Sequence, residues 1–196
     1  MDFKKIIYIT KQFFFNSEVL NINIVESGLI NKTYIVEHLY KGVQSKFILQ
    51  SLSNIFESHD LVNKNHKLIT DYMKTRLDMI NLNIDTMIWG VPNLIRCESN
   101  DHFSFLFESD FWRAMVYIED TFSVDILEDE IMAYQTGLGL AKFHLICSDL
   151  DSSKLTKTIK NFHNTKYYID QYIKTLKDYD FTQLDNSENK RIRNLV

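Results

Sequence analysis

Residues 25–36, Val-Glu-Ser-Gly-Leu-Ile-Asn-Lys-Thr-Tyr-Ile-Val, predict two β-strands joined by a short polar turn. Before this stretch, Ile22 and Ile24 alternate with polar residues, and after it Thr33 begins a run rich in β-branched and aromatic residues. Gly28 and Asn31 lie between the two runs, and both residue types tolerate positive φ. The backbone N–H groups of such a turn suit phosphate oxygens, whereas the simpler interpretation is a hairpin that only turns a sheet.

Length, composition and charge narrow the class of protein. A chain of 196 residues, 45% hydrophobic and 24% charged, has the composition of a globular domain and suits one domain or two lobes that share a cleft. The net charge is −4, and Lys and Arg do not cluster along the chain. Because sequence-independent binding to nucleic acid needs clustered cations, the sequence predicts no nucleic-acid partner.

The cysteines and the N-terminus indicate a cellular compartment. Cys97 and Cys147 are far apart and form no Cys-x-x-Cys motif, so we expect buried thiols in a reducing environment rather than a disulfide or a zinc site. Residues 1–16 contain three consecutive phenylalanines but neither a long apolar core nor a small-residue cleavage site. The sequence therefore predicts a cytoplasmic protein with no membrane partner.

The first two thirds of the chain predict a sheet with two helices. We expect a short helix over 4–15 and a three-stranded antiparallel meander over 21–50, with a second turn at Lys41-Gly42. A long helix follows over 55–79, with an N-cap at Ser53-Asn54 and a break at Asn81, Asn83 and Asp85. Further strands are predicted over 93–97, 102–108 and 112–118.

After Thr121 the pattern becomes helical. Helices are predicted over 127–145, 166–177 and 188–196, with a loop over 158–164. The first of these carries a stripe of small residues that would let another helix approach closely: Ala133, Gly137, Gly139 and Ala141. Strands followed by helices predict an α+β fold in which a small lobe, 1–118, precedes a hinge and helical lobe, 119–196.

Four stretches together resemble a known family. They are 27–34 (Ser-Gly-Leu-Ile-Asn-Lys-Thr-Tyr) with 47–50 (Phe-Ile-Leu-Gln), then 112–121 (Trp-Arg-Ala-Met-Val-Tyr-Ile-Glu-Asp-Thr), 139–144 (Gly-Leu-Ala-Lys-Phe-His) and 155–165 (Leu-Thr-Lys-Thr-Ile-Lys-Asn-Phe-His-Asn-Thr). In this order they resemble the aminoglycoside phosphotransferase/choline kinase-like superfamily, and within it the N-acetylhexosamine kinase-like branch. The resemblance spans nearly the whole chain.

The resemblance implies a protein-kinase-like small lobe that binds ATP with Mg²⁺. The turn containing Gly28, Asn31 and Thr33 would lie over the phosphates. Many kinases carry a phosphate-pairing lysine on the third strand, and here the matching position is Gln50, or Lys46 in a shifted register.

Tyr117, Ile118 and Glu119 would form the hinge, where the backbone of such kinases meets adenine. The implied reaction is transfer of a phosphoryl group from ATP to a small hydroxyl compound such as an amino sugar.

The catalytic loop of this superfamily, His-x-Asp-x-x-x-x-Asn, is absent from the sequence. His144 is followed by Leu-Ile, His163 is followed by Asn-Thr, and His59 is followed directly by Asp60. No catalytic residue or metal ligand is therefore predicted, and the chain resembles the amino-terminal portion of such an enzyme. A second chain or the missing segment would complete it, or the chain would form a homo-oligomer. The alternatives are a nucleotide-binding module without chemistry and a remnant of a truncated gene.

Other residues that stand out have simpler interpretations. We expect His144 to be packed or to cap its helix, and Trp112 and Arg113 to pack and pair locally. Glu128-Asp129-Glu130 is explained by the favourable charge near a helix N-terminus. Tyr167, Tyr168, Tyr172 and Tyr179 are predicted to form a helix packing face.

Overall fold

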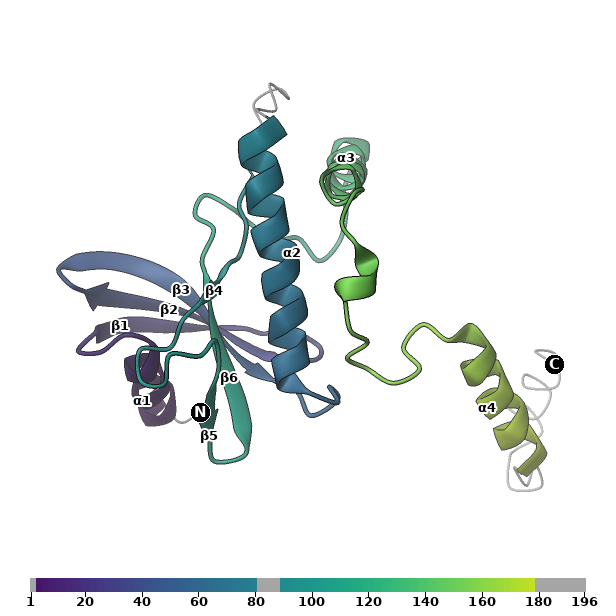
Figure 1. Cartoon of the computed structure of the whole chain (residues 1–196), viewed down its shortest axis with the longest axis horizontal. Helices are drawn as coiled ribbons and strands as arrows, with labels where there is room; N and C mark the ends of the chain where they lie inside the picture. The colour runs from purple at the N-terminus through teal and green to yellow at the C-terminus, as the bar shows by residue number, and fades with distance from the viewer. Residues whose placement is uncertain (1–2, 81–88, 179–196) are drawn as a thin grey trace. The chain divides into compact units, whose positions relative to one another are not determined.

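The computed structural model describes residues 3–80 and 89–178 and has an α+β fold with a six-stranded antiparallel sheet. Contacts between residues divide the chain into two compact units, residues 1–158 and residues 159–196. All six strands belong to the first unit (Figure 1). In the described part of the chain, no helix combines the length and the apolar character needed to cross a membrane.

The predicted helix and meander are both confirmed. Helix α1 (Phe3–Phe13) precedes strands β1 (Glu18–Val25), β2 (Lys32–Tyr40) and β3 (Val43–Leu52), which pair in sequence order. Lys41 and Gly42 connect β2 to β3 with φ values of 50° and 80°. Two consecutive residues with positive φ match the right-handed twist of a hairpin, and the absence of a Cβ makes this conformation available to Gly42 without strain.

The turn between β1 and β2 is longer and has a different geometry. Neither Gly28 nor Asn31 has a positive φ, so the tolerance predicted for these two residues is not used. Instead, the Asn31 Oδ1 atom accepts a hydrogen bond of 2.9 Å from the backbone N–H of Ser53, just beyond the end of β3. The turn is therefore held by a side chain that reaches the neighbouring strand.

The long helix α2 (His59–Ile80) begins later than predicted. The N-cap predicted at Ser53-Asn54 is wrong, because Ser53 heads a separate turn in which its Oγ accepts from Ile55 N–H and its carbonyl accepts from Phe56 N–H. Ser58 takes the capping role, since its Oγ accepts from the N–H of Leu61 at 3.4 Å.

Three further strands complete the sheet. They are β4 (Leu94–Ile95), β5 (Phe105–Phe107) and β6 (Asp110–Val116), each shorter or shifted relative to the predicted strand. The strand order is β1-β2-β3-β6-β4, and β5 pairs with the N-terminal part of β6. Strand β6 thus lies between β3 on one side and β4 and β5 on the other, with α1 and α2 on opposite sides of it (Figure 1).

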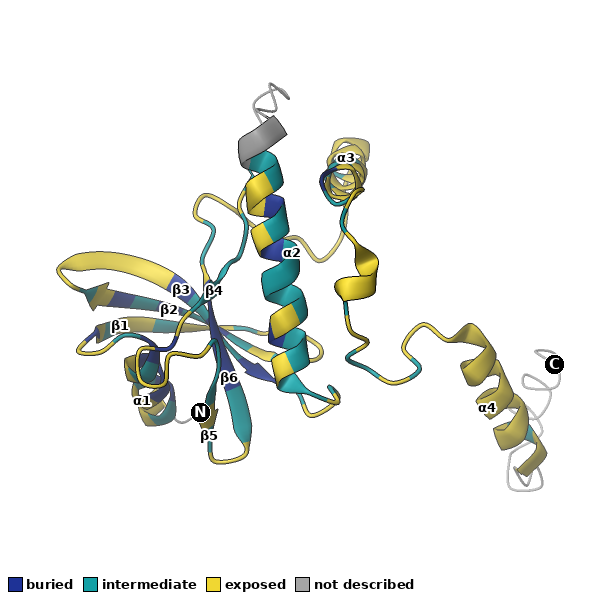
Figure 2. Cartoon of the chain, in the orientation of Figure 1, coloured by how far each residue is buried: buried dark blue, intermediate teal, exposed yellow. Residues whose placement is uncertain are grey.

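One face of the sheet forms the core with α1. Ile6, Ile9 and Phe13 from α1 pack against side chains that alternate along the strands, namely Tyr34, Val36, Phe47, Leu49, Trp112 and Ala114. Figure 2 shows buried residues concentrated in α1 and the central strands. Because truncating a buried Phe or Trp costs about 3–5 kcal/mol, this cluster dominates the stability of the first unit.

Both cysteines are free thiols, as predicted. Cys97 is buried and its Sγ donates to the carbonyl of Gln12 at 3.1 Å, whereas Cys147 is half-buried. Burial raises the pKa of the Cys147 thiol, which keeps it protonated at neutral pH.

The helical part of the chain differs from the prediction in its packing. Helix α3 (Glu130–Ile146) starts at Asp129, whose carboxylate accepts from Met132 N–H at 2.7 Å, in agreement with the predicted acidic start. The close approach predicted for a second helix is not seen at the glycines of the stripe, since a Cβ placed on Gly137 or Gly139 would have nothing within 4 Å among the described residues. His144 is exposed rather than packed.

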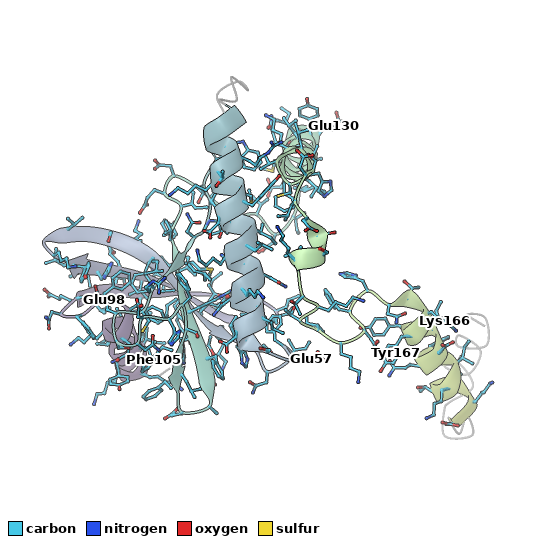
Figure 3. All side chains as sticks on the ribbon, viewed as in Figure 1. Glu57, Glu98, Phe105, Glu130, Lys166 and Tyr167 are labelled. Atoms are coloured by element: carbon cyan, nitrogen blue, oxygen red, sulfur yellow. The ribbon has the colours of Figure 1, made fainter. Side chains whose placement is uncertain are left out.

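The second unit contains α4 (Thr165–Asp178), and residues 158–164 form the predicted loop. Within this unit Tyr167, Tyr168 and Tyr172 are exposed on α4, and Figure 3 labels Tyr167 near its start; the packing face predicted for them stays a prediction. Tyr179, the helix predicted over 188–196 and the break predicted at residues 81–85 lie outside the described residues.

Two histidines predict how stability depends on pH. His38 is 2% exposed, and His66 is a half-buried residue of α2; burial lowers the pKa of both imidazoles. Below about pH 6.5 the unfolded chain binds protons that the folded chain does not, so the free energy of unfolding should fall as the pH drops. The slope should be at most about 1.4 kcal/mol per pH unit for each histidine.

His38→Gln should reduce this slope in denaturant unfolding measured between pH 7.5 and 5.5. His102→Gln, at an exposed position in a turn, serves as the control and should leave the slope unchanged. An equal slope in wild type and His38→Gln would contradict the assignment.

Candidate functional site

The sheet face opposite α1 carries two rows of side chains that cross the strands, and we call it the open face. Directly paired residues of antiparallel strands point to the same side of the sheet. One row, the polar row, joins Thr33, Gln50 and Arg113 through the pairs Thr33↔Gln50 and Gln50↔Arg113. Two residues further along lies the apolar row, formed by Ile35, Ile48, Met115 and Leu94. The open face is thus polar at one end and apolar beside it.

Hydrogen bonds connect the whole polar row. The Gln50 Nε2 atom donates to Thr33 Oγ1 at 2.9 Å, and Gln50 Oε1 accepts from two nitrogens of Arg113, Nε at 3.0 Å and Nη2 at 2.7 Å. The amide of Gln50 therefore links the start of β2 to the centre of β6.

Arg113 is buried between the sheet and α2. It is 8% exposed, and its Nη1 donates to Oδ1 of Asn63 on α2 at 3.3 Å. Burial lowers the pKa of its guanidinium to about 10, so the group remains charged at neutral pH. In the described part of the chain, no carboxylate lies within ion-pair distance of Arg113, and all three of its hydrogen bonds go to neutral amide oxygens.

Helix α2 covers the edge of the polar row through polar and aromatic contacts. Asn63 also donates from Nδ2 to the carbonyl of Phe103 at 3.4 Å, and the His66 ring contacts the carbonyl of Pro92 through Nε2 at 2.7 Å. His59 stacks on Phe111 with ring centroids 4.4 Å apart. These contacts hold α2 against β6 and against the segments that precede β4 and β5, while Ile35 and Ile48 further along the open face stay half-buried.

The predicted turn lies next to the polar row. A Cβ placed on Gly28 would be 3.0 Å from the Asn31 carbonyl oxygen and 4.0 Å from Thr33 Oγ1. Gly28 is exposed, and it therefore combines close approach to the backbone with access from solvent. The structure brings Gly28, Asn31, Thr33 and Gln50 together at one end of the open face.

The predicted hinge residues lie at the other end. Tyr117 follows Arg113 by four residues, a separation of about 13 Å along an extended chain. Lys46, on the same side of β3 as Gln50, sits over the Tyr117 ring at 5.5 Å from its centroid and pairs with Glu119 at 3.7 Å. This places Lys46 at the hinge end, away from the polar row.

Ile118 is held from two sides. Its side chain fills the space beside Gly90, where an added Cβ would lie 2.4 Å from Ile118 Cγ2. Its carbonyl accepts from Thr121 Oγ1 at 2.8 Å, which leaves that oxygen one further lone pair. Glu119 and Asp120 are exposed, as the prediction of a solvated hinge requires.

The sequence did not predict that Asn63 belongs to the site or which residues Arg113 contacts. Local pairing of Arg113 was predicted and is confirmed, but its partners were not. An available signal was a charged residue at an inward position of the apolar strand Trp-Arg-Ala-Met-Val, because such a residue needs buried acceptors.

Neither known protein families nor candidate metal ligands assign a function to this site. No protein-family model matches the sequence. Within residues 3–80 and 89–178, no group of three or more His, Cys, Asp or Glu side chains is placed to hold a metal ion. The arrangement of donors on the open face is therefore the basis for assigning a function.

The Asn31–Ser53 hydrogen bond predicts how the turn is held. Asn31→Ala should leave the Ser53 N–H without its acceptor and lower the free energy of unfolding by about 1 kcal/mol. Hydrogen exchange followed by NMR should show faster exchange at Ser53. Asn23→Ala, at an exposed strand position of β1, is the control and should change neither quantity. Unaltered exchange at Ser53 in Asn31→Ala would contradict this role.

Proposed function

We propose that this chain carries the ATP-binding small lobe of a phosphotransferase of the aminoglycoside phosphotransferase/choline kinase-like superfamily, closest to its N-acetylhexosamine kinase-like branch. In its complete form it transfers a phosphoryl group from ATP to a small hydroxyl substrate such as an amino sugar. The observation that supports this proposal is the order of groups on the open face: hydrogen-bond donors and a cation, then an apolar surface, then the predicted hinge residues Tyr117 to Glu119.

This order suits the parts of a nucleotide. The polar row supplies the amide of Gln50 and the charge of Arg113, which favour phosphate oxygens. The apolar row offers Ile35 and Ile48, both half-buried, as a surface on which a flat base can pack. The backbone at Tyr117 to Glu119 lies beyond it, where the edge of the base would be read.

ATP fits the residues present, whereas the polar row offers no carboxylate to Mg²⁺. Its side-chain oxygens are the hydroxyl of Thr33 and the amide oxygen of Gln50, which Arg113 already occupies, and Mg²⁺ is bound in proteins mainly through carboxylates and substrate phosphates. On this proposal the nucleotide phosphates carry the metal, and carboxylates outside this sequence complete its coordination. Bound Mg²⁺ would supply charge neutralisation at the transferred phosphoryl group.

The surface of α3 supports a larger active form. Its apolar residues lie on all sides of the helix, and several are exposed, including Ile131 at 72% and Leu140 at 57%. A helix that is apolar on every side is normally buried in a protein core. We propose that a second polypeptide segment, which also carries the catalytic Asp and Asn, covers α3 in the active enzyme.

A nucleotide-binding module without chemistry is the second candidate. It is favoured by the absence of His-x-Asp-x-x-x-x-Asn from this sequence. Both candidates require ATP binding by the open face, and only the first requires transfer once the missing segment is supplied.

The test is calorimetric titration of the purified chain with Mg²⁺·ATP. Wild type should bind with a Kd below about 1 mM, corresponding to about −4 kcal/mol. Ile48→Glu should abolish binding, because it places a charge on the apolar row. Val43→Glu, on the same strand at a position already 63% exposed, should bind as wild type does.

The chain alone should transfer no phosphate from ATP to amino sugars in a coupled assay. Absence of ATP binding at 1 mM would overturn the nucleotide-binding proposal. Robust transfer by the 196-residue chain would instead show that the catalytic groups lie within it.

A further inference from the structure

The carbonyl oxygen of Gln50 has no remaining capacity for hydrogen bonds. It accepts from Arg113 Nε at 3.0 Å and from Nη2 at 2.7 Å, and an amide oxygen has two lone pairs. Rotating the amide by 180° would bring its NH₂ group against the guanidinium, so that two donors faced each other. Arg113 therefore decides which end of the Gln50 amide points away from β6.

The outward end is a hydrogen-bond donor. One hydrogen of Nε2 is taken by Thr33 Oγ1 at 2.9 Å, and no second acceptor for this nitrogen is found in the described part of the chain. Gln50 is half-buried, so a ligand on the open face can reach the remaining N–H. A group that accepts hydrogen bonds is favoured there, and a donor is not.

The charge of Arg113 adds to this preference. A buried ion without a counter-charge carries a desolvation penalty of several kcal/mol, and neutral amide oxygens offset only part of it. Arg113 is 8% exposed, and it donates hydrogen bonds to Gln50 and Asn63. An anion placed one amide group away would lower the energy of this charge, since Coulomb interactions are strong where water is excluded.

We propose that Arg113 is a positioning residue that turns Gln50 into a phosphate ligand. It orients the amide so that Nε2 donates away from β6. Its guanidinium, on the β6 side of the amide, supplies the positive charge that the phosphate chain of the nucleotide requires. This inference rests on the proposed function and deepens it, because it names the anion-selecting pair of the site.

The same pair explains why Gln stands where many kinases have Lys. Gln50 and Arg113 are direct cross-strand partners, so Lys at position 50 would place two cations opposite each other. The positive charge is on β6 instead of β3, and the β3 residue transmits it through a hydrogen bond.

Two substitutions test this role against a purely structural one. In Gln50→Glu, the carboxylate pairs with Arg113 but presents negative charge to the ligand; the thermal midpoint should equal or exceed that of wild type while ATP affinity falls at least tenfold, about 1.4 kcal/mol. Arg113→Met should lower ATP affinity about tenfold, the loss of one charge-assisted interaction. Adenosine affinity should change less than about twofold in both variants, as the apolar row is intact.

Arg96→Met is the matched control. Arg96 is exposed and pairs with Asp101 at 3.2 Å, outside the open face, so its removal should leave the affinities for ATP and adenosine unchanged. If Arg113→Met does not fold, Gln50→Glu decides the question, because it keeps the cation and adds its counter-charge.

Tripolyphosphate separates this inference from the proposed function. We expect it to raise the thermal midpoint of wild type and of Arg96→Met, and to leave those of Gln50→Glu and Arg113→Met unchanged. That pattern without ATP binding would support the anion site and overturn the nucleotide proposal. ATP binding that is equal in wild type, Gln50→Glu and Arg113→Met would overturn the role of Arg113, as would the lack of any effect of tripolyphosphate on wild type.

Discussion

The buried guanidinium of Arg113 needs hydrogen-bond acceptors, and this need ties together the elements around it. Its acceptors are Gln50 on β3 and Asn63 on α2, so one side chain of β6 joins this strand to β3 and to α2. Removing water from a charged group is costly unless such acceptors are in place. The position of α2 on the sheet and the orientation of the Gln50 amide are therefore two results of one constraint.

The alternation of side chains along each strand gives the sheet two different faces. One face is filled by aromatic and aliphatic residues that α1 covers, with Phe47 and Trp112 at its centre. The other face presents the polar row and the apolar row side by side and receives α2 over only one edge. A sheet built in this way divides two tasks: the core face holds the fold, while the open face carries donors and an apolar surface.

The local pattern of the sequence was sufficient for most of the fold. Period-two alternation and turn residues predicted the meander, and the apolar residues at helical spacing predicted α1, α2, α3 and α4 to within a few residues. The start of α2 was predicted wrongly because Ser53 is a suitable cap by type, yet its Oγ accepts from Ile55 N–H in a local turn and the helix begins only after Ser58. The packing predicted for His144 and for the glycines in α3 was not found among the described residues. A local sequence pattern contains no information on which helix lies opposite.

The sequence by itself determined the residue types and, through the short turn at Lys41-Gly42, the meander that pairs Thr33 with Gln50, because strand alternation and turn length are local properties. Only the tertiary structure decided that β6 pairs with β3 and so brings Arg113 into this row. Burial under α2 leaves Arg113 charged without a carboxylate in the described part of the chain, and the same burial makes it saturate the carbonyl of Gln50. The orientation of the Gln50 amide thus depends on a buried cation and on neighbours distant in the chain.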